Sequence, residues 1–421
     1  VMSHYNPLVI SVIGGFVLFC GLIFLIKSLS ARAAGTLLIL LCLLAVASEG
    51  RCRSFEDWFR FTEQKPAAWE VIANEADDLQ FQLTPKPAQG SGADTHLFVL
   101  IPKKSSAYVT SLETVLQFFA AKRFYPEFTV LNYAQDEGRG RKILHTALEQ
   151  EVDLIFAMGS LSIDFLFNHF QNGQIPVVSI CAKDPVMMGY IDDYEASSGN
   201  HFAFTSLNVP VKVQMVFLQE LIPDLQHIGI LYARNNASAV LTQADPLRAY
   251  AEGMGIEVLD VAVDNRDNAR QEIEVKLERA VQLMKADDPE CKRSVFYVTG
   301  STSVFSNFDV INRHADGIPV VGASPSMVRG RGEPGALLSI GVGFENNAQL
   351  ASIYAEKILE NQISPGELPV GVITPPDIAI NFRLVRDIGM KIPYNFFELA
   401  NLIFNYQGEK VKSQGMIVNN D

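Results

Sequence analysis

The chain has 421 residues, of which 48% are hydrophobic, so it can bury a large core and is expected to form more than one domain. Its 34 basic and 47 acidic residues give a formal net charge of −13, and the absence of a basic block argues against a nucleic-acid partner. The five cysteines include no CxxC pair and the histidines show no ligand spacing, so neither a metal site nor a cofactor is predicted.

Residues 1–48 predict a membrane segment or a signal region. Residues 7–26 carry no charge and, at about 20 residues, are long enough to cross a bilayer. A second apolar run, 36–47, follows two basic residues and ends in Ala-Val-Ala, a signal-cleavage pattern. Either this second run is the core of a cleaved signal peptide, or both runs form a membrane hairpin with its basic loop in the cytoplasm. Both alternatives place the rest of the chain in the periplasm or on the outer face of the cytoplasmic membrane, exported or N-terminally anchored.

Residues 49–94 are predicted to be a linker, because they end in the Pro-, Gly- and Ser-rich run TPKPAQGSGADT. Apolar strand patterns then alternate with amphipathic helical patterns, and the alternation repeats after about residue 205. The expected strands are 96–102, 128–134, 152–158 and 175–180, followed by 227–233, 257–263, 294–300 and 318–324. This order predicts an α/β fold with two lobes, each a doubly wound parallel sheet.

The last hundred or so residues do not continue the simple alternation. An additional strand and helix at 338–362, and another pair at about 370–393, indicate that the chain crosses back to the first lobe and returns. We therefore expect lobe 1 to comprise 95–206 with 338–362, and lobe 2 to comprise 207–325 with 370–393. Residues 394–421 are treated as a C-terminal tail.

No catalytic motif is found, and the chain is predicted not to be an enzyme. The nearest match to a nucleophile elbow is Gly159-Ser160-Leu161-Ser162. It has Asp164 at the position where the motif needs its final glycine. There is no phosphate-binding GxxxxGK[ST] loop and no HExxH motif. An extracytoplasmic enzyme is therefore the least supported class.

The expected strand ends instead carry small polar groups. Such groups, together with helix N-terminal amides, can hold a small molecule without reacting with it, although Ser, Thr and Asn also favour helix N-caps. The candidate ligand-binding residues after the strands are Ser105, Ser106, Tyr108, Gly159, Ser160, Asp184, Asn236, Ser301 and Ser324.

Several long blocks resemble the periplasmic solute-binding proteins of ATP-binding-cassette (ABC) transporters, type I fold, in the branch with tryptophan- and tyrosine-binding members. The blocks are IPVVSICAKDPVMMGYI, GNHFAFTSLNVPVKVQMVFLQELIPDLQHIGILYARNNAS, IPVVGASPSMVRGRGEPGALLSIGVGFENNAQLASIYAEKIL and INFRLVRDIGMKIP, within 96–393. The resemblance implies two lobes joined by three crossing strands, with a ligand enclosed between them. By position it implies a cleft lined by Ser106, Ser160, Asp184, Asn236, Ser301 and Glu345.

The function implied by this resemblance is capture of a small, amino-acid-like molecule and its delivery to the membrane permease of an ABC importer. Asp184 and Glu345 are candidates to pair with a ligand ammonium group, and Phe344 or Tyr108 to form a wall for its side chain. Asp184 could instead simply cap the loop over Pro185. The alternative function is a membrane-tethered sensory or interaction module with the same ligand-binding fold, suggested by the apolar N-terminal runs.

Overall fold

The computed structural model describes residues 54–62, 67–86, 92, 94–171, 173–195 and 200–418. None of the helices in these ranges has the length and apolar character needed to span a bilayer. The two apolar runs predicted at 7–26 and 36–47 lie outside the described residues. From Phe55 onward the chain forms one unit, which contains two main sheets.

The first sheet has seven strands in the order β1-β2-β4-β3-β5-β6-β7. It is parallel from β4 to β7, and β2 pairs antiparallel with both β1 and β4. The strands are β1 (Trp69–Ala73), β2 (Gln80–Pro85), β3 (His96–Ile101), β4 (Glu127–Asn132), β5 (Leu154–Met158), β6 (Val177–Ile180) and β7 (Phe202–Ala203). The helices of this lobe are η1 (Phe55–Asp57), α3 (Ser106–Ala121), α4 (Glu137–Glu149), α5 (Gly159–His169), α12 (Phe344–Leu359) and η5 (Pro365–Glu367).

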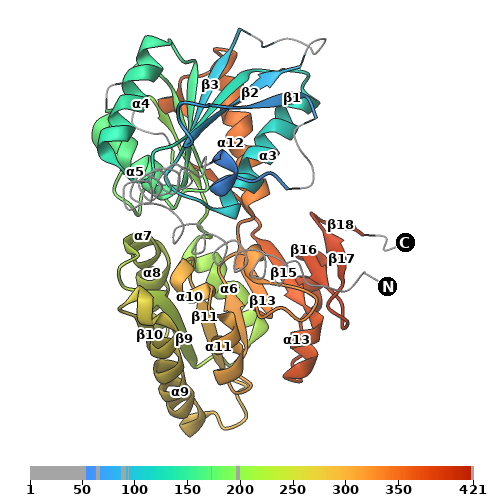
Figure 1. Cartoon of the computed structure of the whole chain (residues 1–421). Helices are drawn as coiled ribbons and strands as arrows, with labels where there is room; N and C mark the ends of the chain where they lie inside the picture. The colour runs from blue at the N-terminus through green and yellow to red at the C-terminus, as the bar shows by residue number, and fades with distance from the viewer. Residues whose placement is uncertain are drawn as a thin grey trace, which may run out of the picture. The chain divides into compact units, whose positions relative to one another are not determined.

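Helices cover both faces of this sheet, which explains why its central strands are apolar throughout. Along β3, Leu97 and Val99 face a core shared with α3 and α12, whereas Phe98 and Leu100 face a core shared with α4 and α5. Figure 1 shows the two helix pairs on opposite sides of the strands.

The second sheet has nine strands in the order β10-β9-β11-β12-β13-β15-β16-β17-β18. It is parallel from β10 to β13, and β15 reverses direction against β13. The strands are β9 (His227–Ala233), β10 (Glu257–Val263), β11 (Ser294–Val298), β12 (Val320–Gly322), β13 (Leu338–Gly341), β15 (Asp377–Asn381), β16 (Ala400–Phe404), β17 (Lys410–Ser413) and β18 (Met416–Ile417). The helices of this lobe are α6 (Val211–Leu221), α7 (Ala237–Ala239), η2 (Val240–Ala244), α8 (Asp245–Gly253), η3 (Arg266–Asn268), α9 (Ala269–Asp287), α10 (Thr302–Phe305), α11 (Phe308–His314), η4 (Pro325–Met327), α13 (Phe382–Asp387) and α14 (Tyr394–Leu399).

The predicted fold class, two α/β lobes with mostly parallel sheets, is confirmed. The chain passes between the lobes after β8 (Thr205–Ser206), after β13, and after β14 (Gly371–Val372). Strands β8 and β14 pair with each other in parallel, so two of the crossing segments run side by side. The segment at 338–362 is divided, because β13 belongs to the second sheet whereas α12 packs against α3.

Two segments contain more strands and helices than the sequence predicted. The expected linker, 49–94, contains β1 and β2 of the first sheet, and the alternating Phe81 and Leu83 of β2 are fully buried in the core shared with α3 and α12. The expected tail, 394–421, contributes α14 and β16 to β18, which extend the second sheet by antiparallel and parallel pairing. Both contain strands of two to six residues. Such short strands carry little periodicity of their own and depend on a neighbour far along the chain.

One glycine of the second sheet gives a direct test of this packing. Gly229 on β9 pairs with Phe296 on β11, and a methyl group at Gly229 would lie 2.3 Å from the Phe296 ring. We expect Gly229→Ala to lower the free energy of unfolding by about 1–3 kcal/mol through overpacking. Urea unfolding followed by circular dichroism measures this change. Gly253→Ala is the matched control, because a methyl group there meets nothing within 4 Å. Equal midpoints for the two variants would contradict the described packing.

Candidate functional site

The carboxyl ends of β3, β5 and β6 lie at one edge of the first sheet, because these three strands are adjacent and parallel. The chain leaves that edge at 102–106, at 159–160 and at 181–184. Candidate residues from three distant parts of the sequence are therefore brought together. This edge is where open α/β sheets bind ligands.

Gly159 and Tyr108 form the tightest contact at this edge. Gly159 starts α5 with a φ of +80°, in the left-handed region, and a methyl group there would lie 2.3 Å from the Tyr108 hydroxyl oxygen. The phenol therefore lies directly against the backbone of the β5–α5 turn. Burial first, then the nearby Cys181 and Tyr133, raises the pKa of Tyr108, so its hydroxyl stays protonated. Its hydroxyl makes no hydrogen bond with the residues described.

Two predicted serines at this edge hold the backbone. Ser105 is the N-cap of α3, and its hydroxyl accepts a hydrogen bond from the backbone N–H of Ala107 at 3.2 Å. The Ser160 hydroxyl accepts one from the backbone N–H of Lys183 at 2.9 Å. Ser105 thus caps α3, which is the alternative role that serine favours. Ser160 fixes the loop that follows β6.

Asp184 has its carboxylate fully engaged within the chain. Oδ1 accepts the backbone N–H groups of Val186 and Met187 at 3.1 and 3.0 Å. Oδ2 accepts the hydroxyl of Tyr194 at 2.9 Å and that of Ser206 at 3.4 Å. Asp184 is 4% exposed. These contacts match the capping alternative, and they leave no oxygen of this carboxylate free for a ligand ammonium group.

Lys183, one residue before Asp184, was not among the predicted ligand-binding residues. Its side chain is partly buried, and a methyl group on Gly300 of the second lobe would lie 3.0 Å from Nζ. Within the described part of the chain Nζ has no hydrogen bond and no ion pair. Burial lowers the pKa of this ammonium group to about 8. A partly desolvated cation without a counter-charge therefore faces the second lobe.

The second lobe presents a short polar segment to this lysine. The Gly300 backbone N–H donates to Gln243 Oε1 at 2.8 Å, and that same oxygen would lie 3.4 Å from a methyl group on Gly300. Gln243 belongs to η2, a π-helical turn, a conformation often found at functional sites. Gln243 and Gly300 were also not among the predicted site residues.

The predicted residues Asn236 and Ser301 contact each other. Asn236 is the N-cap of α7, and its amide donates to the Ser301 hydroxyl at 3.4 Å. Ser301 is fully buried and accepts the backbone N–H of Ala233 at 3.2 Å. Both side chains thus fix the β9 and β11 ends of the second sheet.

The other four predicted residues line a cavity of about 630 Å³, which extends along α3 and α12 and reaches η4, β16 and β17. These residues are Ser106, Ser324, Phe344 and Glu345. Ser324 shares a hydrogen bond of 3.0 Å with Ser326, whereas the Glu345 carboxylate has no partner among the residues that the structure covers. Glu345 is also close enough to Cys181 to act on its thiol. Burial first, and Glu345 as a smaller cause, raise the pKa of Cys181 to about 12, against an opposing hydrogen bond from Ser111.

Comparison with known proteins gives one family and several similar folds. A family model described as ABC transporter substrate binding protein matches residues 127–402. Among curated proteins, no sequence matches significantly. A conserved domain protein from Vibrio cholerae O1 biovar El Tor is 22% identical, with a TM-score of 0.57 over 73% of this chain and 99% of that chain.

Two further solved structures are similar. A ligand-free, open substrate binding protein with adhesive properties from Clostridium difficile is 22% identical, with a TM-score of 0.58 over 73% of this chain and 98% of that chain. An ABC domain in complex with L-Trp from Streptococcus pneumonia is 17% identical, with a TM-score of 0.56 over 73% of this chain and 100% of that chain. At these identities the likeness shows the shared fold.

The Asp184 contacts lead to a prediction that separates the two interpretations of this residue. Asp184→Asn replaces an acceptor that takes two backbone N–H groups and two hydroxyls, so it should destabilise the ligand-free protein by about 1–3 kcal/mol. Thermal and urea unfolding measure the change, with Asp192→Asn, at an exposed position, as the control. Unchanged stability together with a large loss of ligand affinity would restore Asp184 as a ligand contact.

Proposed function

The chain belongs to the family of ABC transporter substrate-binding proteins, which are non-enzymatic and extracytoplasmic, and we propose that it captures an amino-acid-like molecule between its two lobes. In this proposal the ligand passes to the membrane permease of an ABC importer, and the chain works in the periplasm or on the outer face of the cytoplasmic membrane. The N-terminal apolar runs would direct its export or anchor it there.

The observation that carries the proposal is the unpartnered ammonium group of Lys183. A carboxylate bound between the lobes would neutralise it and regain the electrostatic free energy that desolvation costs. The backbone of Gly300 and the side-chain amide of Gln243, both in the second lobe, lie beside this ammonium group. A ligand carboxylate would therefore contact both lobes at once, which favours their closure around it.

Two other groups of the first lobe suit the remainder of an amino acid. Tyr108 offers an aromatic ring and a protonated hydroxyl at the edge from which Lys183 extends. The Glu345 carboxylate has no hydrogen bond and no ion pair among the described residues, and its effect on the pKa of Cys181, the residue after β6, supports a position near Lys183. An ammonium group on the ligand would pair with Glu345. The Streptococcus protein of this fold is in complex with L-Trp, a molecule with both charges, which supports this ligand class.

Substitution of Lys183 tests the proposal directly. Lys183→Met keeps the length of the side chain and removes the charge, so affinity for the ligand should fall by about 30-fold or more. The ligand is first identified by mass spectrometry of small molecules that co-purify under native conditions, with the twenty L-amino acids as an added panel. Isothermal titration calorimetry then compares the wild type, Lys183→Met and Lys212→Met, an exposed lysine on α6.

The same variant has a second expected effect. Because the folded protein holds Lys183 with a lowered pKa, protonation of this group below pH 8 opposes folding, and the penalty disappears as the pH rises from about 8 toward the ordinary lysine value. Lys183→Met should therefore raise the melting temperature of the ligand-free protein at pH 7. Lower stability together with unchanged affinity would show that Lys183 has a structural role and would overturn the proposal.

The pH dependence of binding provides an independent check. A bound anion raises the pKa of Lys183, so binding takes up a proton at any pH above the ligand-free value of about 8. Affinity should be constant near pH 7 and should fall by up to about tenfold per pH unit between pH 8 and the pKa of the bound state. Calorimetry from pH 6.5 to 9.5 should show a steeper decline, beginning near pH 8, in the wild type than in Lys183→Met, in which only the ammonium group of the ligand titrates. A flat wild-type profile would exclude an anion at Lys183.

A further inference from the structure

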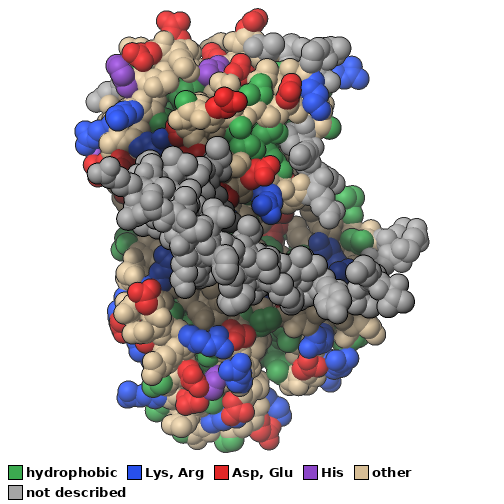
Figure 2. All heavy atoms as spheres, in the orientation of Figure 1, with side chains coloured by type: hydrophobic (Ala, Val, Ile, Leu, Met, Phe, Trp, Pro, Cys, Tyr) green, Lys and Arg blue, Asp and Glu red, His purple; other side chains and the backbone are tan. Residues whose placement is uncertain are grey.

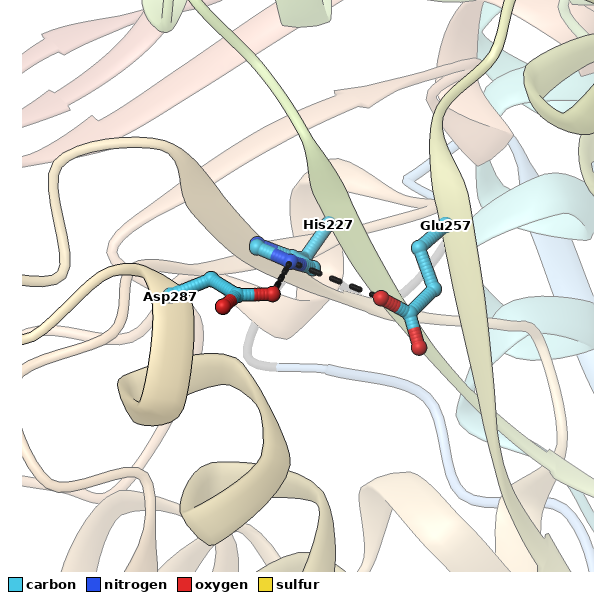
Figure 3. Close-up of side chains that lie close together, drawn as sticks. All are labelled: His227, Glu257 and Asp287. Carbon is cyan, nitrogen blue, oxygen red and sulfur yellow. Dashed lines mark ion pairs between the residues drawn. The ribbon is translucent and has the colours of Figure 1, made fainter.

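Three potential metal ligands meet at the amino-terminal edge of the second sheet, the edge opposite the one at which Gly300 lies. His227 is the first residue of β9, Glu257 is the first residue of β10, and Asp287 is the last residue of α9. The strand register pairs His227 directly with Glu257. Figure 3 shows the carboxylates of Glu257 and Asp287 approaching the same imidazole nitrogen from two sides.

The spacing of the three side chains is close to that of a metal site. Nε2 of His227 lies 3.6 Å from Oε2 of Glu257 and 4.0 Å from Oδ2 of Asp287. Both distances exceed the length of an ordinary hydrogen bond. A tetrahedral Zn²⁺ ion with bonds of about 2.0–2.1 Å separates its ligand atoms by about 3.3 Å. The three ligand atoms lie within 4.8 Å of one another, so shifts of up to about 1.5 Å in the exposed Glu257 and Asp287 side chains would bring them to that separation.

A hydrogen-bond chain behind His227 sets the tautomer that a metal needs. The Ser294 hydroxyl donates to Oδ2 of Asp288 at 2.8 Å, so toward His227 it can only accept. It accepts from Nδ1 of His227 at 3.2 Å, which places the proton of the neutral ring on Nδ1. Nε2 then presents its lone pair to the two carboxylates. A histidine ligand whose other nitrogen is held in this way is a recurring feature of metal sites.

Burial and access also fit an ion taken from solution. The His227 side chain is 5% exposed, whereas those of Glu257 and Asp287 are 58% and 73% exposed. One ligand is therefore rigid, and two mobile ones can close over an ion. The guanidinium of Arg293 donates to the backbone oxygen of Asp287 and to Oε1 of Gln226, and neither contact uses one of the three ligand atoms.

We propose that His227, Glu257 and Asp287 bind one Zn²⁺ ion, with water in the fourth position. An imidazole nitrogen and two carboxylate oxygens form a donor set that zinc accepts. The ion links the starts of β9 and β10 to the end of α9, and so it stabilises the second lobe. The histidines are scattered along the sequence, and only the sheet register reveals this grouping. This site is independent of the proposed ligand site, because it lies at the opposite edge of the sheet.

A second group of similar composition serves as an internal comparison. His314 lies near Glu274 and Glu278, but Nε2 is 3.6 Å from Glu274 and Nδ1 is 3.0 Å from Glu278. One ligand atom of each residue lies within 4.8 Å of the others, but the two carboxylates make their closest approaches to different nitrogens of the ring, which suits one shared ion less well than the arrangement at His227. We expect this group to act as an ion-pair cluster, which makes Glu278→Gln a matched control.

Titration of the purified full-length chain with Zn²⁺, in competition with a chromophoric chelator, tests the proposal. After treatment with EDTA, the wild type should bind one Zn²⁺ with a Kd of about 10 µM or lower. Glu257→Gln and Asp287→Asn keep the shapes of two exposed side chains and should each weaken binding at least tenfold, whereas Glu278→Gln should not. Co²⁺ should give visible absorption bands in the wild type that disappear in His227→Gln.

The same samples report on stability and on independence from the ligand. At roughly a hundredfold excess over Kd, Zn²⁺ should raise the melting temperature of the wild type by about 2–4 °C and leave that of Glu257→Gln unchanged. Circular dichroism in EDTA verifies that each variant is folded. A stoichiometry below about 0.1, or Zn²⁺ affinity unchanged in both Glu257→Gln and Asp287→Asn, would overturn the proposal. So would loss of binding in Glu278→Gln alone.

Discussion

The contacts of Asn208 connect the two lobes at the first crossing and determine how the proposed ligand site is presented. Its Oδ1 accepts the backbone N–H of Asp184 at 2.9 Å, and its Nδ2 donates to the backbone oxygen of Thr242 at 2.9 Å and to the Thr242 hydroxyl at 3.1 Å. A single buried amide thus joins the loop after β6 to the π-helical turn η2. Since a buried amide that loses a partner costs free energy, these two segments are held at a defined separation.

This arrangement explains why the ammonium group of Lys183 has no counter-charge from its own loop. Asn208 and Ser160 hold the backbone on either side of Lys183, and Asp184 uses its carboxylate to fix the residues that follow. The acidic neighbour in the sequence is therefore unable to neutralise the lysine. Natural proteins tend to accept such local instability where function requires it. A cation without a partner among the described residues, in a loop whose backbone is held by Ser160, Asn208 and Asp184, is the pattern expected of a binding residue.

The sequence was sufficient for the architecture and insufficient for the roles of individual residues. Strands 227–233 and 257–263 were predicted with the bounds that the structure has, because long apolar runs between amphipathic helices have few alternatives. The sequence predicts a ligand site at the Lys183-Asp184-Pro185 turn, with Asp184 as either a ligand contact or a loop cap, and this site stays a prediction. Nothing in the local sequence says that Tyr194 and Ser206 satisfy this carboxylate, because both contacts depend on the tertiary fold.

The two edges of the second sheet show why sequence spacing alone was misleading. In a parallel sheet, residues far apart in the sequence become neighbours at each strand start, as His227 and Glu257 do, and at each strand end, as Asn236 and Ser301 do, 65 positions apart. Open sheets bind ligands at the strand ends, so the predicted site residues all follow strand ends and none of them lies at a strand start. Yet both edges gather polar side chains by the same geometry. What distinguishes a candidate site is a polar group that donates or accepts no hydrogen bond among the described residues: Nζ of Lys183, which faces the strand ends of the second sheet from the first lobe, and Nε2 of His227 at the strand starts.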